Sequence, residues 1–207
     1  AMDGVCVVIS PLIALMKDQV DNLTKRGIKA CAVYSGMKKQ EIDVLLDNCV
    51  YGKIKFLYLS PERLSSELVK VRLCKMKISF LAIDEAHCIS QWGYDFRPAY
   101  LRIAELRELL PQQKILALTA TATPEVVKDI QQQLNFKNSK VFIASFERKN
   151  LAYIVLQEED KWNRLLKIVT SLKGAGIIYA RNRKRTQEIA LFLQRNSITA
   201  DYYHAGL

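Results

Sequence analysis

Several patterns that identify common classes of protein are missing from this 207-residue sequence. No run of about 18 apolar residues occurs, so no segment is predicted to cross a membrane as a helix. Five cysteines are scattered without a C-x-x-C pair, which predicts buried thiols in a reducing cytoplasm and neither a zinc site nor a disulfide framework. The phosphate-binding pattern G-x-x-x-x-G-K-[ST] is absent too, because the only Gly-Lys pair, Gly52-Lys53, is followed by Ile54.

Acidic residues are scarce relative to basic ones. Lys and Arg number 31 against 21 Asp and Glu, which gives a formal net charge of +10. The imbalance is steeper toward the carboxyl end, where residues 147–207 carry 11 basic and 6 acidic side chains. A basic chain of ordinary apolar content is typical of a globular protein with a polyanionic partner, although charge alone does not separate nucleic acid from an anionic membrane.

Apolar runs alternate with segments of helical periodicity along the whole chain. Strands are predicted over 5–9, 30–34, 54–59, 78–83, 114–118, 140–143, 152–156, 175–180 and 199–203. Helices are predicted between them, over about 12–27, 38–50, from 62, and over about 98–110, 124–134, 160–172 and 184–195. This alternation predicts βαβ units, an α/β fold and a parallel sheet. A polar stretch at 145–151 predicts two domains, 1–146 and 147–207.

The most informative strand, 78–83, ends in two adjacent carboxylates, Asp84 and Glu85. Open α/β sheets bind their ligands at the carboxyl ends of their strands. An apolar strand followed by Asp is the Walker-B arrangement, in which the Asp holds Mg²⁺ beside nucleotide phosphates. A neighbouring Glu is then placed to orient and deprotonate the attacking water. The alternative is an acidic pair that favours the start of a helix.

Aromatic and charged side chains follow in the stretch DEAHCISQWGYDFRPAY, residues 84–100. It offers four rings and one planar cation, which belong to Trp92, Tyr94, Phe96, Arg97 and Tyr100. Bases of single-stranded nucleic acid stack on such groups regardless of sequence, although the rings would equally fill a core. The stretch resembles the DEAH box and aromatic-rich loop of RecQ-family DNA helicases. RNA helicases with a DEAH box do not usually continue with S-Q-W-G-x-D-F-R-P.

Other segments resemble motifs of the same family, in the same order along the chain. They are ISPLIALMKDQV (9–20), YLSPERL (58–64), ALTATAT (117–123), GIIYARNR (176–183) and DYYHAGL (201–207). Several also have a local interpretation without any ligand. The first two are also typical of a helix after a strand, the third of a helix N-cap, and the fourth of a solvated first helical turn.

The resemblance implies two RecA-like domains, with ATP and Mg²⁺ in the cleft between them. It implies that Asp84 holds Mg²⁺ through water and that Glu85 is the general base. The residues implied to couple hydrolysis to DNA are His87, Gln91, Trp92, Phe96, Arg97, Thr119 and Thr121. The residues implied to contact DNA are Ser10, Lys17, Arg63, Trp92, Phe96, Arg97, Tyr179, Arg183 and His204.

The predicted function is that of the central part of an ATP-dependent 3′-to-5′ DNA helicase. The resemblance implies action on single-stranded DNA and duplex junctions in recombination and repair, in the cytoplasm, at the nucleoid of a bacterium or in the nucleus of a eukaryote. Related helicases carry their phosphate loop before the 9–20 motif and their arginine motifs after the 201–207 motif, so the chain by itself is expected to be inactive. Two alternatives stay open: a non-catalytic nucleic-acid-binding module and a DEAH-type RNA helicase.

Overall fold

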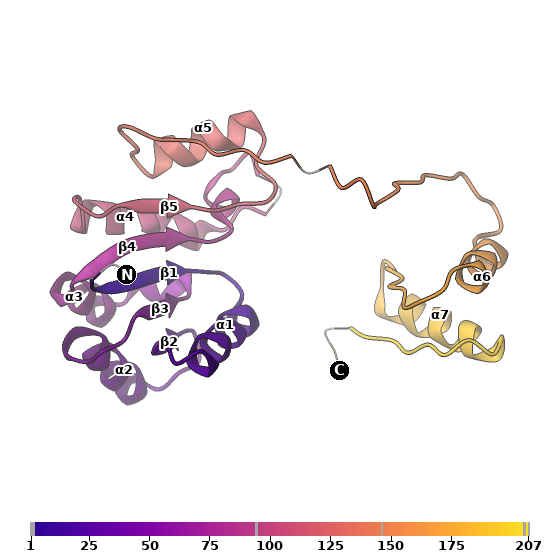
Figure 1. Ribbon diagram of the computed structural model, residues 1–207, viewed down its shortest axis with the longest axis horizontal. Coiled ribbons are helices and arrows are strands. Elements are labelled where there is room, and N and C mark those ends of the chain that lie inside the picture. The colour runs from indigo at the N-terminus through magenta and orange to yellow at the C-terminus, as the bar shows by residue number, and fades with distance from the viewer. Residues whose placement is uncertain (1–2, 94, 146, 205, 207) are drawn as a thin grey trace. The chain divides into compact units, whose positions relative to one another are not determined.

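In a computed structural model, the chain divides into two compact units, residues 1–142 and 143–207 (Figure 1). The structure describes residues 3–93, 95–145, 147–204 and 206. The boundary between the units lies close to the predicted domain division at 146/147. That the two units are separate helicase domains stays a prediction.

A five-stranded sheet forms the centre of the first unit. Its strands are β1 (Val5–Ile9), β2 (Ala30–Val33), β3 (Phe56–Leu59), β4 (Ile78–Ile83) and β5 (Ile115–Ala117). All pairings are parallel, in the order β2-β3-β1-β4-β5. Side chains at successive positions of the inner strands are buried, as expected for a sheet with helices on both faces. The prediction of an α/β fold with a parallel sheet is confirmed.

Five α-helices flank the sheet (Figure 1). They are α1 (Ile13–Lys25), α2 (Lys39–Tyr51), α3 (Glu67–Lys75), α4 (Arg102–Leu109) and α5 (Pro124–Gln133). Two of the predicted helices begin as 3₁₀ turns, η1 (Pro61–Ser65) and η3 (Pro98–Leu101), before α3 and α4. Each of these turns starts at a proline, whose fixed φ suits a first helical position. The N-cap of α5 is Thr123, whose hydroxyl accepts from the amide of Val126.

The strands of the first unit end level with one another. Ile9 pairs with Ile83, and Ile83 pairs with Ala117, so β1, β4 and β5 finish at one edge of the sheet. The amide of Asp84 still donates to the carbonyl of Ile9, at 2.9 Å. The ladder therefore continues one residue past β4 and fixes the backbone at the first carboxylate. Ser10, directly after β1, lies beside it.

Within its described residues, the second unit contains two of the predicted helices and none of the predicted strands. Helices α6 (Lys161–Ser171) and α7 (Arg183–Arg195) begin at side-chain caps provided by Asp160 and Asn182. The strands predicted over 152–156, 175–180 and 199–203 are wrong, as is the one predicted over 140–143 at the end of the first unit, since no described residue in these ranges belongs to a strand. Apolar runs indicate a preference for burial, but a strand also needs a hydrogen-bonded neighbour.

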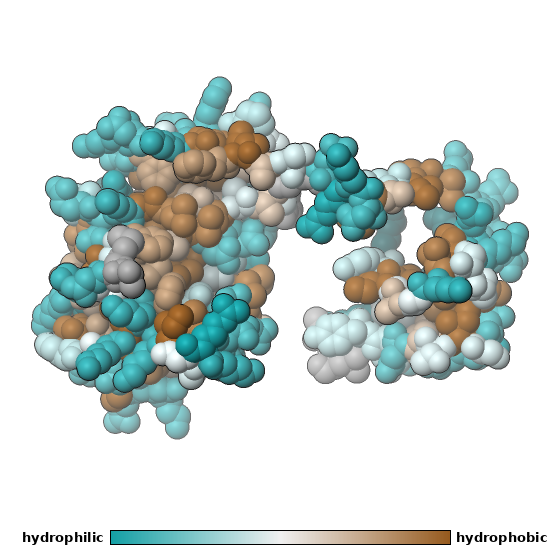
Figure 2. Space-filling view, in the orientation of Figure 1, coloured by the Kyte–Doolittle hydropathy of each residue, from teal (hydrophilic) through white to brown (hydrophobic). Residues whose placement is uncertain are grey.

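Apolar side chains are consequently exposed in this unit, as the brown areas of Figure 2 show. Tyr153 is 85% exposed and Val155 96%. The contact between α6 and α7 centres on Trp162, whose ring lies 4.7 Å from that of Phe192 and 4.2 Å from the guanidinium of Arg185. Such cation–π contacts contribute about 0.5–1 kcal/mol at exposed sites. Among the described residues, no helix is long and apolar enough to span a membrane.

Candidate functional site

Three further hydrogen bonds, besides that from its amide to Ile9, hold Asp84 at the end of β4. Its side chain accepts from the hydroxyl of Ser10 at 3.1 Å and from the amide of Glu85 at 3.0 Å, one bond to each carboxylate oxygen. Its backbone carbonyl accepts from the hydroxyl of Tyr100 at 2.8 Å. Ser10 is 2% exposed and Tyr100 is fully buried, so both anchors belong to the packed interior. The position of the carboxylate is therefore fixed before any ligand binds.

This carboxylate fits the hard cation that the resemblance implies. A carboxylate has about four lone-pair sites, and the two hydrogen bonds described above use two of them. Asp84 is also only partly buried, so water has access to it. Mg²⁺ prefers one or two carboxylates and keeps several waters when it binds beside phosphates.

Glu85 adopts a left-handed backbone conformation, with φ 49° and ψ 44°. Such a conformation costs a residue with a side chain about 1–2 kcal/mol, so the surrounding structure must enforce it. Two backbone bonds do so: the amide of Ala86 donates to the carbonyl of Leu118, and the amide of Cys88 donates to the carbonyl of Glu85, both at 2.9 Å. The chain thereby turns sharply after β4 and leaves the Glu85 side chain 36% exposed at the sheet edge.

A hydrogen-bonded chain links Glu85 to the segment after β5. The Nδ1 atom of His87 lies 3.3 Å from Oε2 of Glu85 and 2.9 Å from Oγ1 of Thr119. The same hydroxyl accepts from the amide of Thr121 at 3.3 Å. His87 is 3% exposed, so these contacts are shielded from water. Four residues assigned to catalysis or coupling from the sequence therefore meet in one network.

The loop after the DEAH box combines exposed and buried groups. Trp92 is 80% exposed, Gln91 is exposed and Phe96 is partly buried, so these side chains are accessible to a ligand to different degrees. The suggestion that Tyr100 offers a stacking face is wrong, because its ring is buried and its hydroxyl anchors Asp84. Tyr94 lies outside the described residues.

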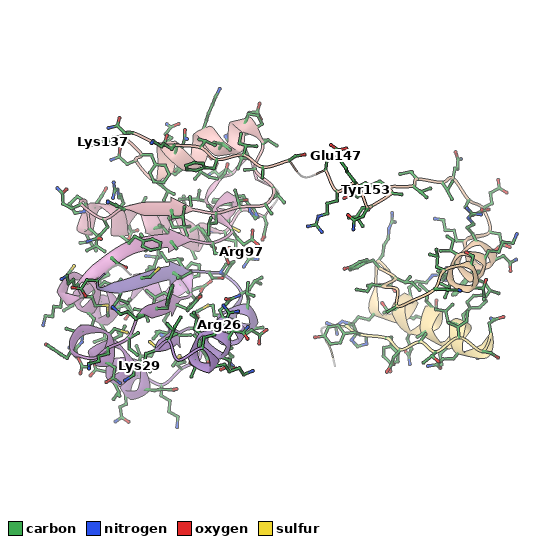
Figure 3. The ribbon with its side chains drawn as sticks, viewed as in Figure 1. Arg26, Lys29, Arg97, Lys137, Glu147 and Tyr153 are labelled. Carbon is green, nitrogen blue, oxygen red and sulfur yellow. The ribbon has the colours of Figure 1, made fainter. Side chains whose placement is uncertain are left out.

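Arg97, a predicted coupling residue, lies beyond the carboxyl ends of the strands (Figure 3). It forms an ion pair with Asp95 through Nη2 at 2.9 Å and Nε at 3.2 Å. The hydrogen bonds from this guanidinium hold the pKa of Asp95 below its ordinary value. Cys88 lies 3.8 Å from the same carboxylate oxygen, and burial raises the pKa of its thiol to about 11. Asp95 and Cys88 were not assigned to the site from the sequence. The only sequence signal is the spacing of Asp95 and Arg97, an acid and a base two residues apart, which indicates a contact between them.

Two of the predicted DNA contacts in the first unit converge on Tyr34, the residue after β2. Arg63 donates to its carbonyl through Nε at 2.9 Å and Nη2 at 2.8 Å. The Nζ atom of Lys17 lies 5.0 Å from the centre of its ring. Lys17 is exposed. Ser10, another predicted DNA contact, is buried and its hydroxyl is hydrogen-bonded to Asp84. The structure thus gives Arg63 and Ser10 internal partners, and phosphate contacts by these three residues stay predictions.

In the second unit, Arg183 and His204 both lie near Gly206. The backbone amide of Gly206 donates to Nδ1 of His204 at 3.2 Å. A β-carbon placed on Gly206 would lie 2.7 Å from Nη1 of Arg183, at the start of α7. The two matched segments, 176–183 and 201–207, are therefore neighbours here. Tyr179 is 91% exposed, and its predicted contact with DNA is untested.

A parallel sheet flanked by helices, with adjacent Asp and Glu at the carboxyl end of an inner strand, is the arrangement of a RecA-like α/β domain. Comparison of the sequence with known protein families agrees with this class of domain and identifies a family within it. The chain belongs to the DEAD/DEAH box helicases, whose family model matches residues 2–130.

Its relatives include RecQ helicases. The chain is 45% identical over 208 residues to the ATP-dependent DNA helicase RecQ of Bacillus subtilis, covering 99% of this chain and 35% of that protein. It is 41% identical over 206 residues to RecQ of Haemophilus influenzae, covering 99% of this chain and 33% of that protein. The chain thus spans about a third of the length of these relatives. The structure of the DUF1998 helicase MrfA matches with a TM-score of 0.68 and 19% identity, over 93% of this chain and 31% of that chain, which supports the fold.

Proposed function

We propose that this chain is the DEAH-bearing part of a RecQ-type helicase that uses ATP hydrolysis to move along DNA and separate its strands. The observation that carries the proposal is the network of Asp84, Glu85, His87 and Thr119 at the carboxyl edge of the sheet. It joins a fixed carboxylate, a candidate general base and the segment after β5. The similarity to RecQ helicases over 99% of the chain supports DNA as the nucleic acid.

Asp84 would hold Mg²⁺ through water, with Ser10 and the Glu85 amide keeping its carboxylate in place. When bound with ATP, Mg²⁺ neutralises negative charge on the phosphates. Glu85 then orients a water and accepts its proton as general base, which typically contributes about 10²–10⁴-fold to a rate. His87 positions the Glu85 side chain, because its Nδ1 atom lies within reach of both Glu85 and Thr119.

The loop that carries Trp92 would report DNA binding to this network. A base stacked on an exposed ring contributes about 1–3 kcal/mol, enough to favour one loop arrangement several-fold to more than a hundredfold. Gly93 is one of the loop residues that pack against the DEAH turn, since a β-carbon there would lie 2.8 Å from the carbonyl of His87. A displacement at Trp92 therefore reaches His87 through one closely packed neighbour.

The remaining parts of the proposal rest on the resemblance to RecQ helicases. They are ATP and Mg²⁺ as cofactors, 3′-to-5′ movement, and single-stranded DNA and duplex junctions as substrates. The protein would act where the genome lies, in the cytoplasm of a bacterium or the nucleus of a eukaryote. The 207-residue chain alone is proposed to be inactive, because it lacks G-x-x-x-x-G-K-[ST], which provides amides and a lysine for the phosphates.

The test is the ATPase rate of the complete protein that contains this chain, measured with Mg²⁺ and titrated with single-stranded DNA or RNA. We expect stimulation by DNA that Glu85→Gln abolishes, and no turnover by the 207-residue chain. Stimulation by RNA alone would instead indicate an RNA helicase. Tight DNA binding without hydrolysis by the unaltered protein would indicate a non-catalytic binding module. Turnover by the short chain that Glu85→Gln abolishes would contradict its proposed inactivity.

A further inference from the structure

Three potential metal ligands from the DEAH turn and the following loop lie together on the side of His87 away from Thr119. They are the imidazole of His87, the thiol of Cys88 and the carboxylate of Asp95, with one ligand atom of each within 4.8 Å of the others. Nε2 of His87 and Oδ2 of Asp95 each lie 3.8 Å from Sγ of Cys88. His87 and Cys88 are buried, whereas Asp95 is 41% exposed and provides a route from solvent.

These separations are close to those of a tetrahedral zinc site. Zinc binds sulfur at about 2.3 Å and nitrogen at about 2.0–2.1 Å, which places the two donors of a tetrahedron about 3.6 Å apart. Cys88 and His87 therefore need to approach by only a few tenths of an ångström. Asp95 has the larger adjustment to make, and its side chain is the exposed one. A water would occupy the fourth position, as in other three-ligand zinc sites.

The groups around these ligands match the supporting contacts of known metal sites. A metal-bound histidine usually donates from its other ring nitrogen to a carboxylate or another acceptor, and a bound carboxylate is itself hydrogen-bonded. Here Nδ1 of His87 faces Glu85 and Thr119, and Asp95 accepts from Arg97. Both supporting contacts exist without the ion, which is an observation independent of the spacing of the three ligands.

We propose that His87, Cys88 and Asp95 form a site for a thiophilic divalent cation, with Zn²⁺ as the physiological candidate. One thiolate, one imidazole and one carboxylate suit Zn²⁺ and its spectroscopic substitute Co²⁺, whereas Mg²⁺ prefers oxygen ligands alone. On binding, the Sγ–H bond of Cys88 breaks, a metal–sulfur bond forms and the proton leaves to solvent. Because the thiol must lose its proton to bind the metal, affinity rises with pH. This site could not be predicted from the sequence, because its ligands do not form a C-x-x-C pattern.

A bound ion would tie the DEAH turn to the loop segment at Asp95. This consequence, unlike binding itself, rests on the proposed function: the ion would restrain the movement by which the loop reports DNA. Zinc would then act as an inhibitor of DNA-stimulated hydrolysis.

The binding test uses Co²⁺ added to the 207-residue chain under reducing, metal-free conditions. We expect one equivalent of Co²⁺ to produce thiolate charge-transfer absorption and the strong visible bands of tetrahedral cobalt, both removed by Zn²⁺ and not by excess Mg²⁺. Cys88→Ser should abolish the charge-transfer band. Asp95→Asn, at a partly exposed position, should weaken binding and retain the fold. Thr119→Val should weaken it by about 10–100-fold, the usual effect of losing a supporting hydrogen bond.

Matched controls use two other thiols. Cys74 is exposed, and Cys31 lies 3.5 Å from Cys49, so the latter pair is the main competing thiol site in the part of the chain that the structure describes. Cys74→Ser and Cys31→Ser should leave the bands unchanged. Bands that survive Cys88→Ser and Asp95→Asn but disappear with Cys31→Ser would place the metal elsewhere and overturn the proposal, as would an absence of bands at millimolar Co²⁺.

The inhibitory consequence is tested separately in the complete protein. Each variant is compared with its own zinc-free rate of DNA-stimulated ATP hydrolysis. Stoichiometric Zn²⁺ should lower the rate of the parent, and Cys88→Ser should remove the sensitivity. Cobalt binding without zinc inhibition would retain the site and refute the regulatory role. Failure of DNA to stimulate the zinc-free parent would instead count against the proposed function.

Discussion

Replacing Tyr100 with phenylalanine tests the anchor that holds the first carboxylate. The ring is fully buried and its hydroxyl donates to the carbonyl of Asp84 at 2.8 Å. Phenylalanine retains the ring and removes only the oxygen, so core packing should be preserved. Burial raises the pKa of Tyr100 well above its ordinary value, and the hydroxyl therefore remains a donor throughout the neutral and mildly alkaline range. The loss of stability caused by Tyr100→Phe should therefore not depend on pH in that range.

The expected cost follows from the carbonyl that is left behind. A buried acceptor that loses its partner destabilises a protein by about 1–3 kcal/mol. Asp84 is only partly buried, so water replaces some of the lost bond and we expect about 1–2 kcal/mol. For a chain of this length, about 2–4 °C in Tm corresponds to each kcal/mol, so the transition of the first unit should move down by about 2–8 °C.

The assay is urea and thermal unfolding of the 207-residue chain, with Tyr58→Phe as the matched control. Tyr58 is 8% exposed, and its hydroxyl has no protein partner in the described part of the chain. We expect that control to change the free energy of unfolding by less than about 0.5 kcal/mol. Equal effects of the two substitutions would refute the anchoring role of Tyr100. In the complete protein, Tyr100→Phe should also raise the Mg²⁺ concentration needed for half-maximal hydrolysis.

Two further predictions concern the site, and a third concerns the cysteines. In the complete protein, Glu85→Gln should slow hydrolysis by about 10²–10⁴-fold with nearly unchanged nucleotide affinity, whereas Asp84→Asn should weaken the response to Mg²⁺; equal loss of nucleotide affinity in both would contradict these roles. Trp92→Ala, or Phe96→Ala, should retain basal ATPase and most DNA affinity and lose DNA stimulation and unwinding, and normal stimulation in ATPase titrations would make the rings structural. With a disulfide reagent at pH 8, we expect one rapidly reacting thiol, and Cys74→Ser should abolish that rapid reaction. The reason is that Cys74 is exposed, whereas burial raises the pKa of two other thiols to about 11. Several rapidly reacting thiols would contradict the packing.

The parallel sheet could be predicted because its evidence is local. A strand covered on both faces is a continuous apolar run; β1 and β3 have this form, and β4 has it apart from Ser79. The strands predicted beyond residue 139 show the limit of the same reasoning. Runs such as 152–156 have the right composition, but pairing depends on a neighbour that composition does not report. The prediction that all five cysteines are buried was wrong for one of them, Cys74, on α3.

The parts of the site that directly follow strand ends could be predicted from the sequence. The side-chain hydrogen bonds between distant segments could not. Asp84, Glu85, His87 and Thr119 meet because β4 and β5 are adjacent and end level. The burial of Tyr100 had a signal, since it lies three residues before Ile103 and therefore extends the buried face of α4 toward the DEAH turn. Its hydrogen bond to a carbonyl 16 residues earlier had none.

The contacts around the carboxylates also distinguish variants of the anchoring residues from variants of the loop. The left-handed conformation of Glu85 costs about 1–2 kcal/mol, while each hydrogen bond that fixes its neighbours contributes about 0.5–1.5 kcal/mol. The bonds from Ser10 and Tyr100 to Asp84, together with those in the turn itself, therefore outweigh the strain and hold the carboxylates in place without DNA. The exposed Trp92 is less constrained by packing. Changes to the anchors should consequently alter hydrolysis equally with and without DNA, whereas changes to the loop should alter only the ratio of the two rates.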